Sequence, residues 1–526
     1  MEWLRVVTLF VPTRDLADIG RPFSLVYTTV HAFQLRFGCY LIMAPKQLCG
    51  DKSSAYKPLR TALHKNQNKT HRFARHQTET RAIVSLAIPA IISQMAQAGM
   101  GVIDAIMAGH HSATSLAAIA VGTNLFNPVI VFIIGILLAL NPMVAQLNGQ
   151  QQWQKIPAIF QNGMFLALLL VIPSFFILRS LEPVLHLIGL DSTVIPITQG
   201  YLEALSWGMP GLHLFLALRF ANEGLFSTKA IMVVAVSALP LNVVLNYWFM
   251  YGGLGIEAMG AVGLGWATGL TYLYMFIALA LYTAKTRRYH HLNIFGQWYK
   301  PDFTVIKETI TLGVPIGLSI GLEVGLFAGV GLMIGSYGIH QISGHQIAMS
   351  ISAFSYMMPL GLSIAISARV GYHMGRENPL EAKSSGYLGI MMALIIMLAN
   401  AIFLVSFPTL LAKLYSTDPT VIVVASQLLF FSALYQLADG TQVAAIAALR
   451  GMKDTKIPLL ICIFAYWVIA FPLGYWLAET LDYGVKGYWI AMVFGLFIAA
   501  IMLTSRFYIL MNKKTQLWLN SAQQRN

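Results

Sequence analysis

Twelve apolar runs recur along this chain between residues 83 and 510, separated by short segments rich in Gly, Pro, Lys and Asp. A helix needs roughly 20 mostly apolar residues to cross a bilayer, and each run is long enough. Hydrophobic residues make up 57% of the 526 residues and charged residues 10%, so polar groups are too few to cover a water-facing surface. The pattern predicts an all-α membrane protein.

The predicted spans fall into two sets of six. The first set is 83–107, 116–146, 159–178, 197–221, 231–251 and 261–282, and the second is 310–336, 342–370, 385–407, 421–449, 457–478 and 488–510. We expect five regions: a basic, poorly ordered extension (1–80), a six-helix lobe (81–284), a linker (285–307), a second six-helix lobe (308–512) and a tail (513–526). An apolar patch at 25–44 is interrupted by His31, Gln34 and Arg36, which disfavours a thirteenth span.

The two sets repeat each other. Pro89 in LAIP matches Pro315 in LGVP, a shift of 226 residues, and GLFSTK at 224–229 matches GMKDTK at 451–456 after one slip. Each half holds an even number of spans, so both halves run the same way through the membrane. We therefore expect two lobes related by a pseudo-twofold axis along the membrane normal, facing a central cavity.

Positive charges sort onto alternate connections. One set carries Arg72, Arg75, Arg81, Lys155, Lys229, Lys285, Arg287, Arg288, Lys300, Arg369, Arg376, Lys383, Arg450, Lys453, Lys456, Arg506, Lys513 and Lys514, whereas the other carries Arg179, Lys413 and Lys486. Positively charged loops stay in the cytoplasm. We therefore expect both termini and the middle linker to be cytoplasmic.

Three carboxylates lie inside predicted spans: Asp104, Glu323 and Asp439. A charge near the bilayer centre costs about 2.5–3.5 kcal/mol on insertion scales, so each acid needs either a structural partner or a function. The repeat favours function, because Asp104 corresponds to Val330 and Glu323 corresponds to Gln97. Such buried acids could exchange a proton or bind Na⁺.

Polar and small residues mark the helix faces. Ser432, Tyr435, Asp439 and Gln442 form a polar stripe at helical spacing, which should face water or partners. Gly313, Gly317, Gly321, Gly325 and Gly329 recur every four residues, a pattern of close helix packing, and Glu323 points away from that face.

Weaker candidates lie in the first lobe. Asn242 and Asn246 sit at i and i+4 and either line a cation site or bond to a neighbouring helix, and Gln97 shares a face with Asp104. Arg219 and Glu223 have the spacing of an i, i+4 ion pair.

Other functional classes find little support. The net charge of +13 is scattered over short loops, which disfavours nucleic acid as a partner. Cys39, Cys49 and Cys462 form no CxxC pair, so we expect no structural metal. A membrane-embedded enzyme would need a nucleophile with a base, or metal ligands, within the spans, and the sequence offers neither set. We expect no cofactor other than a coupling ion.

The chain resembles the bacterial multidrug-efflux branch of the multidrug and toxic compound extrusion (MATE) family. The motifs are VIDAIMAG in the first span, PLNVVLNYWFMYG in the fifth, PIGLSIGLEVGLF in the seventh and YQLADGTQVAAIAALRGMKDT from the tenth. The resemblance implies twelve helices in two lobes, and export of cationic, amphiphilic drugs and toxins driven by H⁺ or Na⁺. It places cation-coupling or substrate roles on Asp104, Glu323, Tyr435 and Asp439, with Na⁺ possible at the last three.

The same resemblance makes Gln97, Asn242, Asn246, Ser432 and Gln442 candidate lining residues, and it implies a monomer among lipids of the bacterial inner (plasma) membrane. A lipid-linked precursor flippase of the same broad superfamily is the alternative. That activity would call for a more cationic central cavity, to hold pyrophosphate, whereas the central residues singled out here are acidic.

Overall fold

The computed structural model describes residues 57–187, 189–253 and 255–524. The chain divides into two units, residues 1–74 and 75–526. Of the first unit, residues 57–74 are described, and they form the start of helix α3 (Lys57–His111). The patch at 25–44, Cys39 and Cys49 lie outside the described residues, and so does most of the predicted extension.

The described part of the second unit is helical, in agreement with the predicted all-α class. Its first half contains α3, α4 (Ala113–Leu138), α5 (Leu140–Gly149), α6 (Ile156–Arg179), α7 (Glu182–Leu187), α8 (Ile195–Trp207), α9 (Met209–Gly224), α10 (Thr228–Tyr251) and α11 (Ala261–Lys285). The short 3-10 helices η1 (Trp153–Lys155) and η2 (Arg287–Tyr289) lie in connections.

The second half contains α12 (Phe303–Ile334), α13 (Ile339–Gly375), α14 (Pro379–Ser406), α15 (Pro408–Lys413), α16 (Pro419–Gly451), α17 (Lys456–Cys462), α18 (Phe471–Tyr475) and α19 (Val485–Gln524). A 3-10 turn, η3 (Gly335–Tyr337), ends α12, and two π-helical stretches, η4 (Ile463–Ala470) and η5 (Trp476–Thr480), flank α18. Side chains of Asp302, Asn378 and Asp418 cap the starts of α12, α14 and α16 by accepting a backbone N–H.

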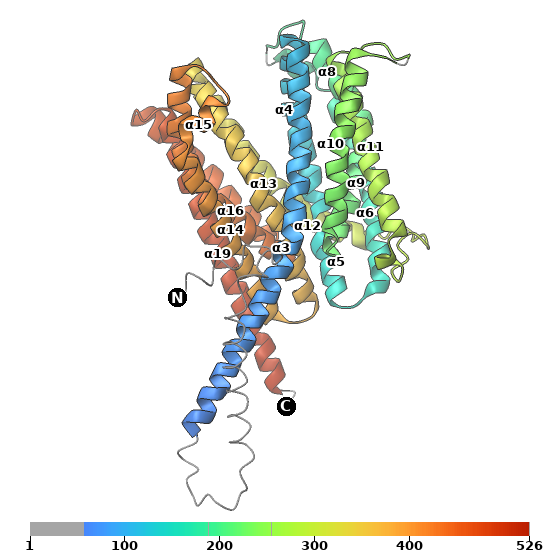
Figure 1. Ribbon diagram of the computed structural model, residues 1–526, viewed down its shortest axis with the longest axis vertical. Coiled ribbons are helices and arrows are strands. Elements are labelled where there is room, and N and C mark those ends of the chain that lie inside the picture. The colour runs from blue at the N-terminus through green and yellow to red at the C-terminus, as the bar shows by residue number, and fades with distance from the viewer. Residues whose placement is uncertain (1–56, 188, 254, 525–526) are drawn as a thin grey trace, which may run out of the picture. The chain divides into compact units, whose positions relative to one another are not determined.

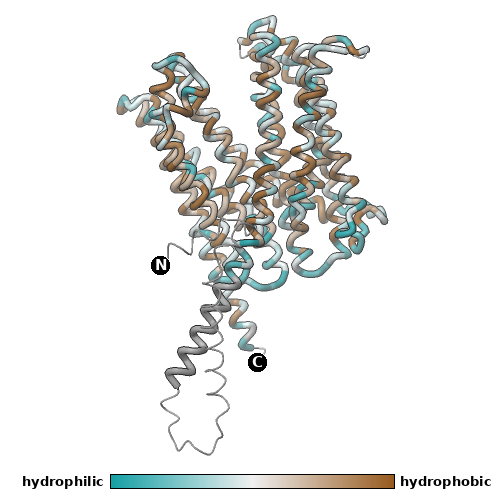
Figure 2. The backbone as a smooth tube through the Cα atoms, viewed as in Figure 1, coloured by the Kyte–Doolittle hydropathy of each residue, from teal (hydrophilic) through white to brown (hydrophobic). Residues whose placement is uncertain are grey.

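Eleven helical segments in the described residues are long and apolar enough to cross a membrane. They match eleven of the twelve predicted spans. The fourth predicted span, 197–221, is divided into α8 and α9 at Gly208, so neither piece reaches the length of a single span. Pro210 lies in the first turn of α9, where its missing N–H leaves no helical hydrogen bond unmade. Hydrophobic residues dominate the middle of these helices, and hydrophilic residues gather at their ends (Figure 2).

Two hydrophobic cores correspond to the two halves. α13, α14, α16 and α19 pack around one core, and α4, α6, α8, α9, α10 and α11 pack around the other (Figure 1).

The first helix of each half crosses from one core to the other. In α3, Ile83 and Leu86 lie in the core of the second half, whereas Met100 lies in the core of the first. In α12 the order is reversed, because Ile316 lies in the first core and Val330 in the second. The first helix of each half therefore packs partly in the hydrophobic core of the other half.

Two equivalent glycines, one in each half, allow close contacts between the halves. A Cβ added to Gly149 would overlap the carbonyl oxygen of Tyr372, and a Cβ added to Gly375 would overlap the carbonyl oxygen of Gln146. The shift of 226 residues that relates Pro89 to Pro315 also relates Gly149 to Gly375 and Gln146 to Tyr372, so the two contacts are equivalent. The repeat inferred from the sequence is therefore a real spatial repeat, and here it holds the ends of α5 and α13 together.

Of the five glycines that recur every four residues in α12, four pack against neighbouring helices. Gly313 and Gly317 lie against the backbone of α4, at Ile136 and Phe132. Gly325 and Gly329 approach the aromatic rings of Trp467 and Phe471, whereas Gly321 faces open space. Close approach along most of one face leaves Glu323 on another face, as predicted.

Candidate functional site

A cavity of about 560 Å³ lies between the two halves. Its polar lining includes Gln97 of α3, Arg219 of α9, Glu323 of α12, and Tyr435, Asp439 and Arg450 of α16. Apolar side chains supply most of the remaining wall, among them Met100, Phe126, Phe327 and Met357. An apolar wall with a few converging polar groups suits an amphiphilic organic molecule.

Glu323 and Asp439 lie side by side in this cavity. The amide nitrogen Nε2 of Gln442 donates to Glu323 Oε1 at 3.0 Å and to Asp439 Oδ1 at 3.3 Å. The hydroxyl of Tyr466 donates to Gln442 Oε1 at 2.6 Å, which fixes the orientation of that amide. Both carboxyl groups are at least 94% buried. Two negative charges this close repel each other strongly, and a proton or a bound cation relieves the repulsion.

The rest of the predicted stripe on α16 surrounds this acid pair. Ser432, Tyr435, Asp439 and Gln442 are all buried, so the stripe faces neighbouring helices and the cavity rather than lipid, as expected. Ser432 Oγ lies 2.6 Å from Ser352 Oγ on α13. Tyr435 lines the cavity, whereas Ser432 and Gln442 lie behind it.

Asp104 forms a separate cluster inside the first half. Its Oδ1 accepts from Asn246 Nδ2 at 2.6 Å, and its Oδ2 accepts from Thr268 Oγ1 at 2.9 Å. Asn246 Nδ2 also reaches Asn242 Oδ1 at 3.2 Å. Within the described residues, Asn246 Oδ1 is buried without a hydrogen-bond partner. The cluster thus gathers several oxygen atoms, one of them unsatisfied, which is the donor type that hard cations and protons seek.

Asp104, Asn242 and Asn246 do not line the cavity between the halves. Asn246 bonds to Asp104 of α3, and Asn242 Nδ2 lies 3.4 Å from Thr268 Oγ1 of α11, so both asparagines bond to neighbouring helices. The acid of the first half is therefore spatially separate from the acid pair Glu323 and Asp439 of the second half.

Gln97 belongs to a third network. Arg219 donates through Nη1 to Gln97 Oε1 at 2.9 Å, through Nη2 to Gln94 Oε1 at 2.6 Å, and through Nε to Glu223 Oε1 at 2.9 Å. The predicted ion pair between Arg219 and Glu223 is confirmed. Gln97 and Glu323, which correspond in the repeat, both line the cavity.

Several partners of these sites gave no signal in the sequence. Thr268, Gln94 and Tyr466 are uncharged polar residues in largely apolar runs, and none of them was singled out by a polar stripe as long as that of α16. Each becomes recognisable when helices far apart in the sequence are brought together. Arg450 was visible in the sequence as a loop charge but not as a residue of the cavity.

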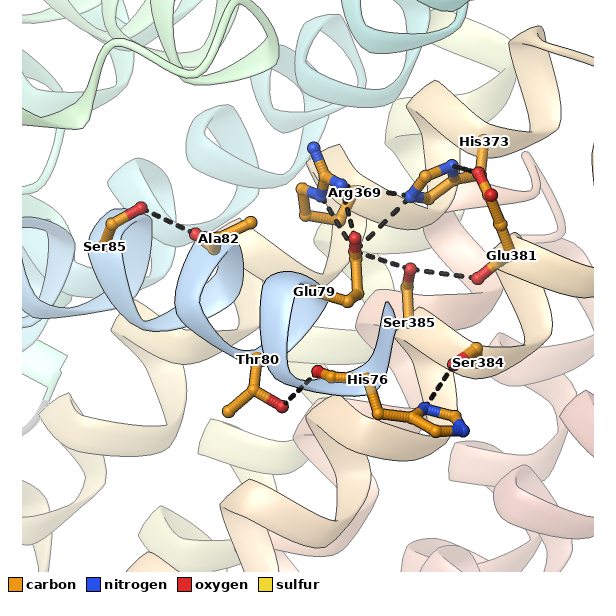
Figure 3. Close-up of polar contacts among 10 residues, drawn as sticks. All are labelled: His76, Glu79, Thr80, Ala82, Ser85, Arg369, His373, Glu381, Ser384 and Ser385. Carbon is orange, nitrogen blue, oxygen red and sulfur yellow. Dashed lines mark hydrogen bonds and ion pairs between the residues drawn. The ribbon is translucent and has the colours of Figure 1, made fainter. Parts of the chain in front are cut away.

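Glu79 anchors a fourth network, near the contact between α5 and α13 (Figure 3). Its Oε1 accepts from Arg369 Nε at 2.8 Å and from Ser385 Oγ at 2.7 Å, and its Oε2 pairs with Arg369 Nη2. His373 lies between two carboxylates, with Nε2 at 3.4 Å from Glu79 Oε1 and Nδ1 at 2.9 Å from Glu381 Oε2. Glu79 therefore ties α3 to α13 and α14.

Arg369 also reaches the first half of the chain. Its guanidinium lies over the ring of Phe226, which follows α9, at 5.3 Å from the ring centroid. Gln146 of α5 adds a direct bond between the halves by donating to the carbonyl oxygen of Gly451 at 2.9 Å. Polar contacts thus reinforce the glycine contacts at this end of the cavity.

The two halves match the MatE family separately, over residues 89–248 and 315–476. The matched segments start at Pro89 and Pro315, the residues that defined the repeat. The chain belongs to the MATE family. A multidrug resistance protein MdtK of Yersinia enterocolitica is 39% identical over 450 residues, covering 84% of this chain and 98% of its own. A multidrug resistance protein NorM of Photobacterium profundum is 38% identical and covers 82% of this chain and 95% of its own.

Solved MATE structures share the fold. The eukaryotic MATE transporter AtDTX14 superposes with a TM-score of 0.78 at 21% identity, covering 84% of this chain and 98% of its own. An outward-facing multidrug resistance MATE transporter gives a TM-score of 0.76 at 20% identity, covering 83% of this chain and 97% of its own. The two-lobe layout of twelve membrane helices is consistent with the MATE fold, with the eleven long helical segments and the pair α8 and α9 as the twelve.

Proposed function

We propose that this MATE protein is a secondary active exporter that exchanges cationic or amphiphilic organic compounds for H⁺ or Na⁺ by alternating access. The observation that carries the proposal is the acid pair Glu323 and Asp439 in a largely apolar cavity between the halves. An apolar wall binds the body of the substrate, and the two acids attract its positive charge.

Competition for the same charge provides the coupling. When a proton or Na⁺ neutralises the acid pair, a cationic substrate loses its electrostatic partner and leaves. A ligand shifts a conformational equilibrium only by its differential affinity for the two states, and moving the ratio from 1:99 to 99:1 takes about 5.5 kcal/mol. A buried pair of carboxylates provides interactions of that order, because attraction between charges is strong in a poorly solvated site.

Asp104 is assigned a second coupling role. The unsatisfied oxygen of Asn246, beside the Asp104 carboxylate, supports cation or proton binding inside the first lobe. Because this cluster does not line the cavity, it would act on the substrate through the packing of α3 and α10. Tyr435 contributes to the cavity wall beside Asp439. The centroid of its ring lies 6.0 Å from the centroid of the Phe327 ring.

The moving parts in this proposal are the lobes 81–284 and 308–512, joined by the linker 285–307. Contacts at Gly149 and Gly375 close one end of the interface. The loops near Gly149 and Gly375 are rich in Lys and Arg, which supports a cytoplasmic location for this end of the interface. The same rule supports a cytoplasmic location for both termini, including the tail 513–526. The conformation described here is then closed towards the cytoplasm, in a monomer of the bacterial inner (plasma) membrane.

A lipid-linked precursor flippase remains the second candidate. The guanidiniums of Arg219 and Arg450 in the cavity wall favour an anionic headgroup. However, Glu323 and Asp439 would repel a pyrophosphate that occupied the same space. The exporter assignment accommodates the acids directly.

Dye efflux from proteoliposomes tests the assignment. Purified protein is reconstituted and loaded with a fluorescent organic cation, and either a Na⁺ gradient or a pH gradient is imposed. We expect dye movement under at least one gradient and none without a gradient. Movement of a lipid-linked pyrophosphate, with no response of the dye to either gradient, would favour the flippase.

A further inference from the structure

The connection between α11 and α12 is fastened to the first lobe by the buried amide of Gln161 in α6. Its Nε2 donates to the carbonyl oxygens of Ile294 at 2.8 Å and Gln297 at 2.7 Å. Its Oε1 accepts from the backbone N–H of Tyr299 at 2.8 Å. Three bonds from one side chain thus hold residues 286–302, called the strap below, against the start of α6.

A pocket of about 670 Å³ lies between the strap and the residues that open α6. Trp153 forms part of one wall and His291 part of the other, with their rings edge to face and their centroids 5.5 Å apart. Leu292 of the strap is buried in the core of the first half, which holds that wall in place. The volume suits a small molecule or a headgroup. Amide groups in the lining come from Gln154, Asn293 and Gln297.

Exposed positive charges lie on the two chain segments that form this pocket. Four of them have no ion-pair partner among the described residues: Lys155, Lys285, Arg287 and Lys300. Lys155 and Lys300 are each the direct neighbour in sequence of a residue that lines the pocket. Residues 147–181 and 258–301, which supply both walls, contain no Asp or Glu. The surroundings of the pocket therefore favour an anion.

The first acid after the strap's basic residues is engaged in helix capping. Asp302 Oδ1 accepts from the backbone N–H of Thr304 at 2.8 Å, at the start of α12, and its own N–H donates to Asn162 Oδ1 at 2.7 Å. Arg288 is likewise engaged, because its Nη2 donates to the carbonyl oxygen of Leu225 at 2.9 Å. The four cations without an ion-pair partner are thus opposed by one carboxylate, which caps α12.

The position of the pocket indicates which kind of anion it would meet. Its walls directly precede α6 and directly follow α11, two segments long and apolar enough to cross a membrane, so it lies where the bilayer meets water. Large aromatic side chains are exposed around it, with Trp298 82%, Phe303 77% and Trp153 45% exposed. Exposed tryptophans beside Lys and Arg are typical of the headgroup layer of a membrane. A lipid therefore fits this place better than a soluble anion does.

We propose that this pocket binds the headgroup of an anionic phospholipid. Lys155 and Lys300 attract the phosphate, the amides bond to headgroup hydroxyls, and Trp153 packs against the glycerol backbone. The site goes beyond the export function, because it shares no residue with the cavity between the halves. With the topology proposed above, the lipid belongs to the cytoplasmic leaflet and links the first lobe to it.

Competition binding to the purified protein in detergent tests the proposal. The probe is phosphatidylglycerol with a fluorescent acyl chain, followed by fluorescence anisotropy. Its competitors are unlabelled phosphatidylglycerol, phosphatidylethanolamine with the same acyl chains, and soluble glycerol phosphate. We expect phosphatidylglycerol to displace the probe at concentrations at least about tenfold lower than phosphatidylethanolamine, because only the former has a net negative headgroup. Glycerol phosphate, which has no acyl chain, should displace it only at far higher concentrations.

Two variants locate the site. Lys155→Gln combined with Lys300→Gln should weaken binding of the probe roughly tenfold or more, since each basic residue near an anionic headgroup contributes to affinity. Trp153→Ala keeps every charge and should weaken binding at least about threefold, because it removes part of the pocket wall.

The matched control is Lys413→Gln combined with Lys486→Gln. It removes the same charge from exposed positions on the other set of loops and should change binding less than about twofold. All five altered residues are exposed, so each variant should keep the elution volume of the wild type in size-exclusion chromatography.

Equal displacement by the two phospholipids, or an equal loss in both double lysine variants, would show non-specific association and overturn the proposal. Unchanged affinity in Trp153→Ala would show that the pocket is not the site. Glycerol phosphate that competes as well as phosphatidylglycerol would assign the pocket to a soluble phosphate and overturn the lipid assignment. Binding in detergent needs no transport, so a failure of the export function would leave this comparison intact.

Discussion

Gly149 of α5 lies directly against the backbone carbonyl of Tyr372 in α13, with no room for a side chain between them. We expect Gly149→Val to prevent this end of the interface from closing, because neither backbone can move away without separating α5 from α13. A single cysteine at Val443 in the cavity wall should then become accessible from the cytoplasmic side. Labelling of inverted vesicles with an impermeant thiol reagent measures that access.

The matched control for this experiment is Gly321→Val, since a Cβ at Gly321 meets open space. Its labelling pattern should equal that of the parent. If Gly149→Val also left the pattern unchanged, the glycine contact would not be the barrier on that side.

Glu79 should fasten α3 to the second lobe. Glu79→Gln keeps the shape but removes the charge that pairs with Arg369, and loss of a largely buried charged hydrogen bond costs about 1–3 kcal/mol. We expect this variant to favour the conformation open to the cytoplasm, with labelling at Val443 from that side increased roughly tenfold.

Deletion of residues 2–74 provides the comparison, because it keeps Glu79 and its partners. The predicted extension is dispensable in this account, so insertion and efflux should persist after the deletion. Normal expression with loss of both would show that residues before Arg75 are needed. Full efflux by Glu79→Gln, with unchanged labelling, would contradict the role of the Glu79 network.

Much of this architecture followed from the sequence, for identifiable reasons. The shift between Pro89 and Pro315 depends only on periodic spacing, and it predicted the two similar halves. The reciprocal contacts of Gly149 and Gly375 became visible only in the structure. The stripe on α16 was readable because helical periodicity places Tyr435 and Asp439 on one face. Pro210 at the break in the fourth span did not predict that break, because Pro89 and Pro315 lie inside helices that continue past them.

Tertiary contacts were beyond such reasoning. Thr268 bonds to Asp104 across 164 positions of sequence, and nothing in the sequence distinguishes it from Thr271 and Thr283 of the same helix. Glu79 looked like part of a basic extension because its partner, Arg369, lies 290 residues away. The crossing of α3 between two cores likewise depends on packing, which the pattern of apolar residues in one helix does not determine.

The loop at 283–302 should be cytoplasmic. It carries Lys285, Arg287, Arg288 and Lys300 in one short segment, the densest positive cluster between predicted spans. After replacement of Cys39, Cys49 and Cys462, a single cysteine at exposed Lys300 should react with an impermeant reagent in inverted vesicles and not in intact cells. A cysteine at exposed Lys413, on the opposite set of loops, should show the reverse pattern. Reaction of the Lys300 position from outside would reverse the proposed topology.

Asp104→Asn should preserve folding while reducing ion-driven transport. The asparagine oxygen can still accept from Asn246, and its amide nitrogen can donate to the hydroxyl of Thr268, but the side chain cannot carry negative charge. We expect gradient-driven efflux to fall at least about tenfold, a change that corresponds to 1.4 kcal/mol, with dye binding in the cavity retained because Asp104 does not line it. Dye binding lost in parallel with transport would show that Asp104 acts on the substrate site itself.

The central claim is that Glu323 and Asp439 couple cation entry to substrate exit, and gradient-driven efflux measures it directly. Proteoliposomes containing matched amounts of folded wild-type, Glu323→Gln or Asp439→Asn protein are loaded with a cationic dye, and efflux is followed under an imposed Na⁺ or pH gradient. The substitutions keep size and hydrogen bonding to Gln442 but remove the charge. The account predicts that both variants insert and fold and that neither transports above background. Wild-type rates with unchanged ion dependence in both variants would show that these carboxyls are structural and would contradict the mechanism.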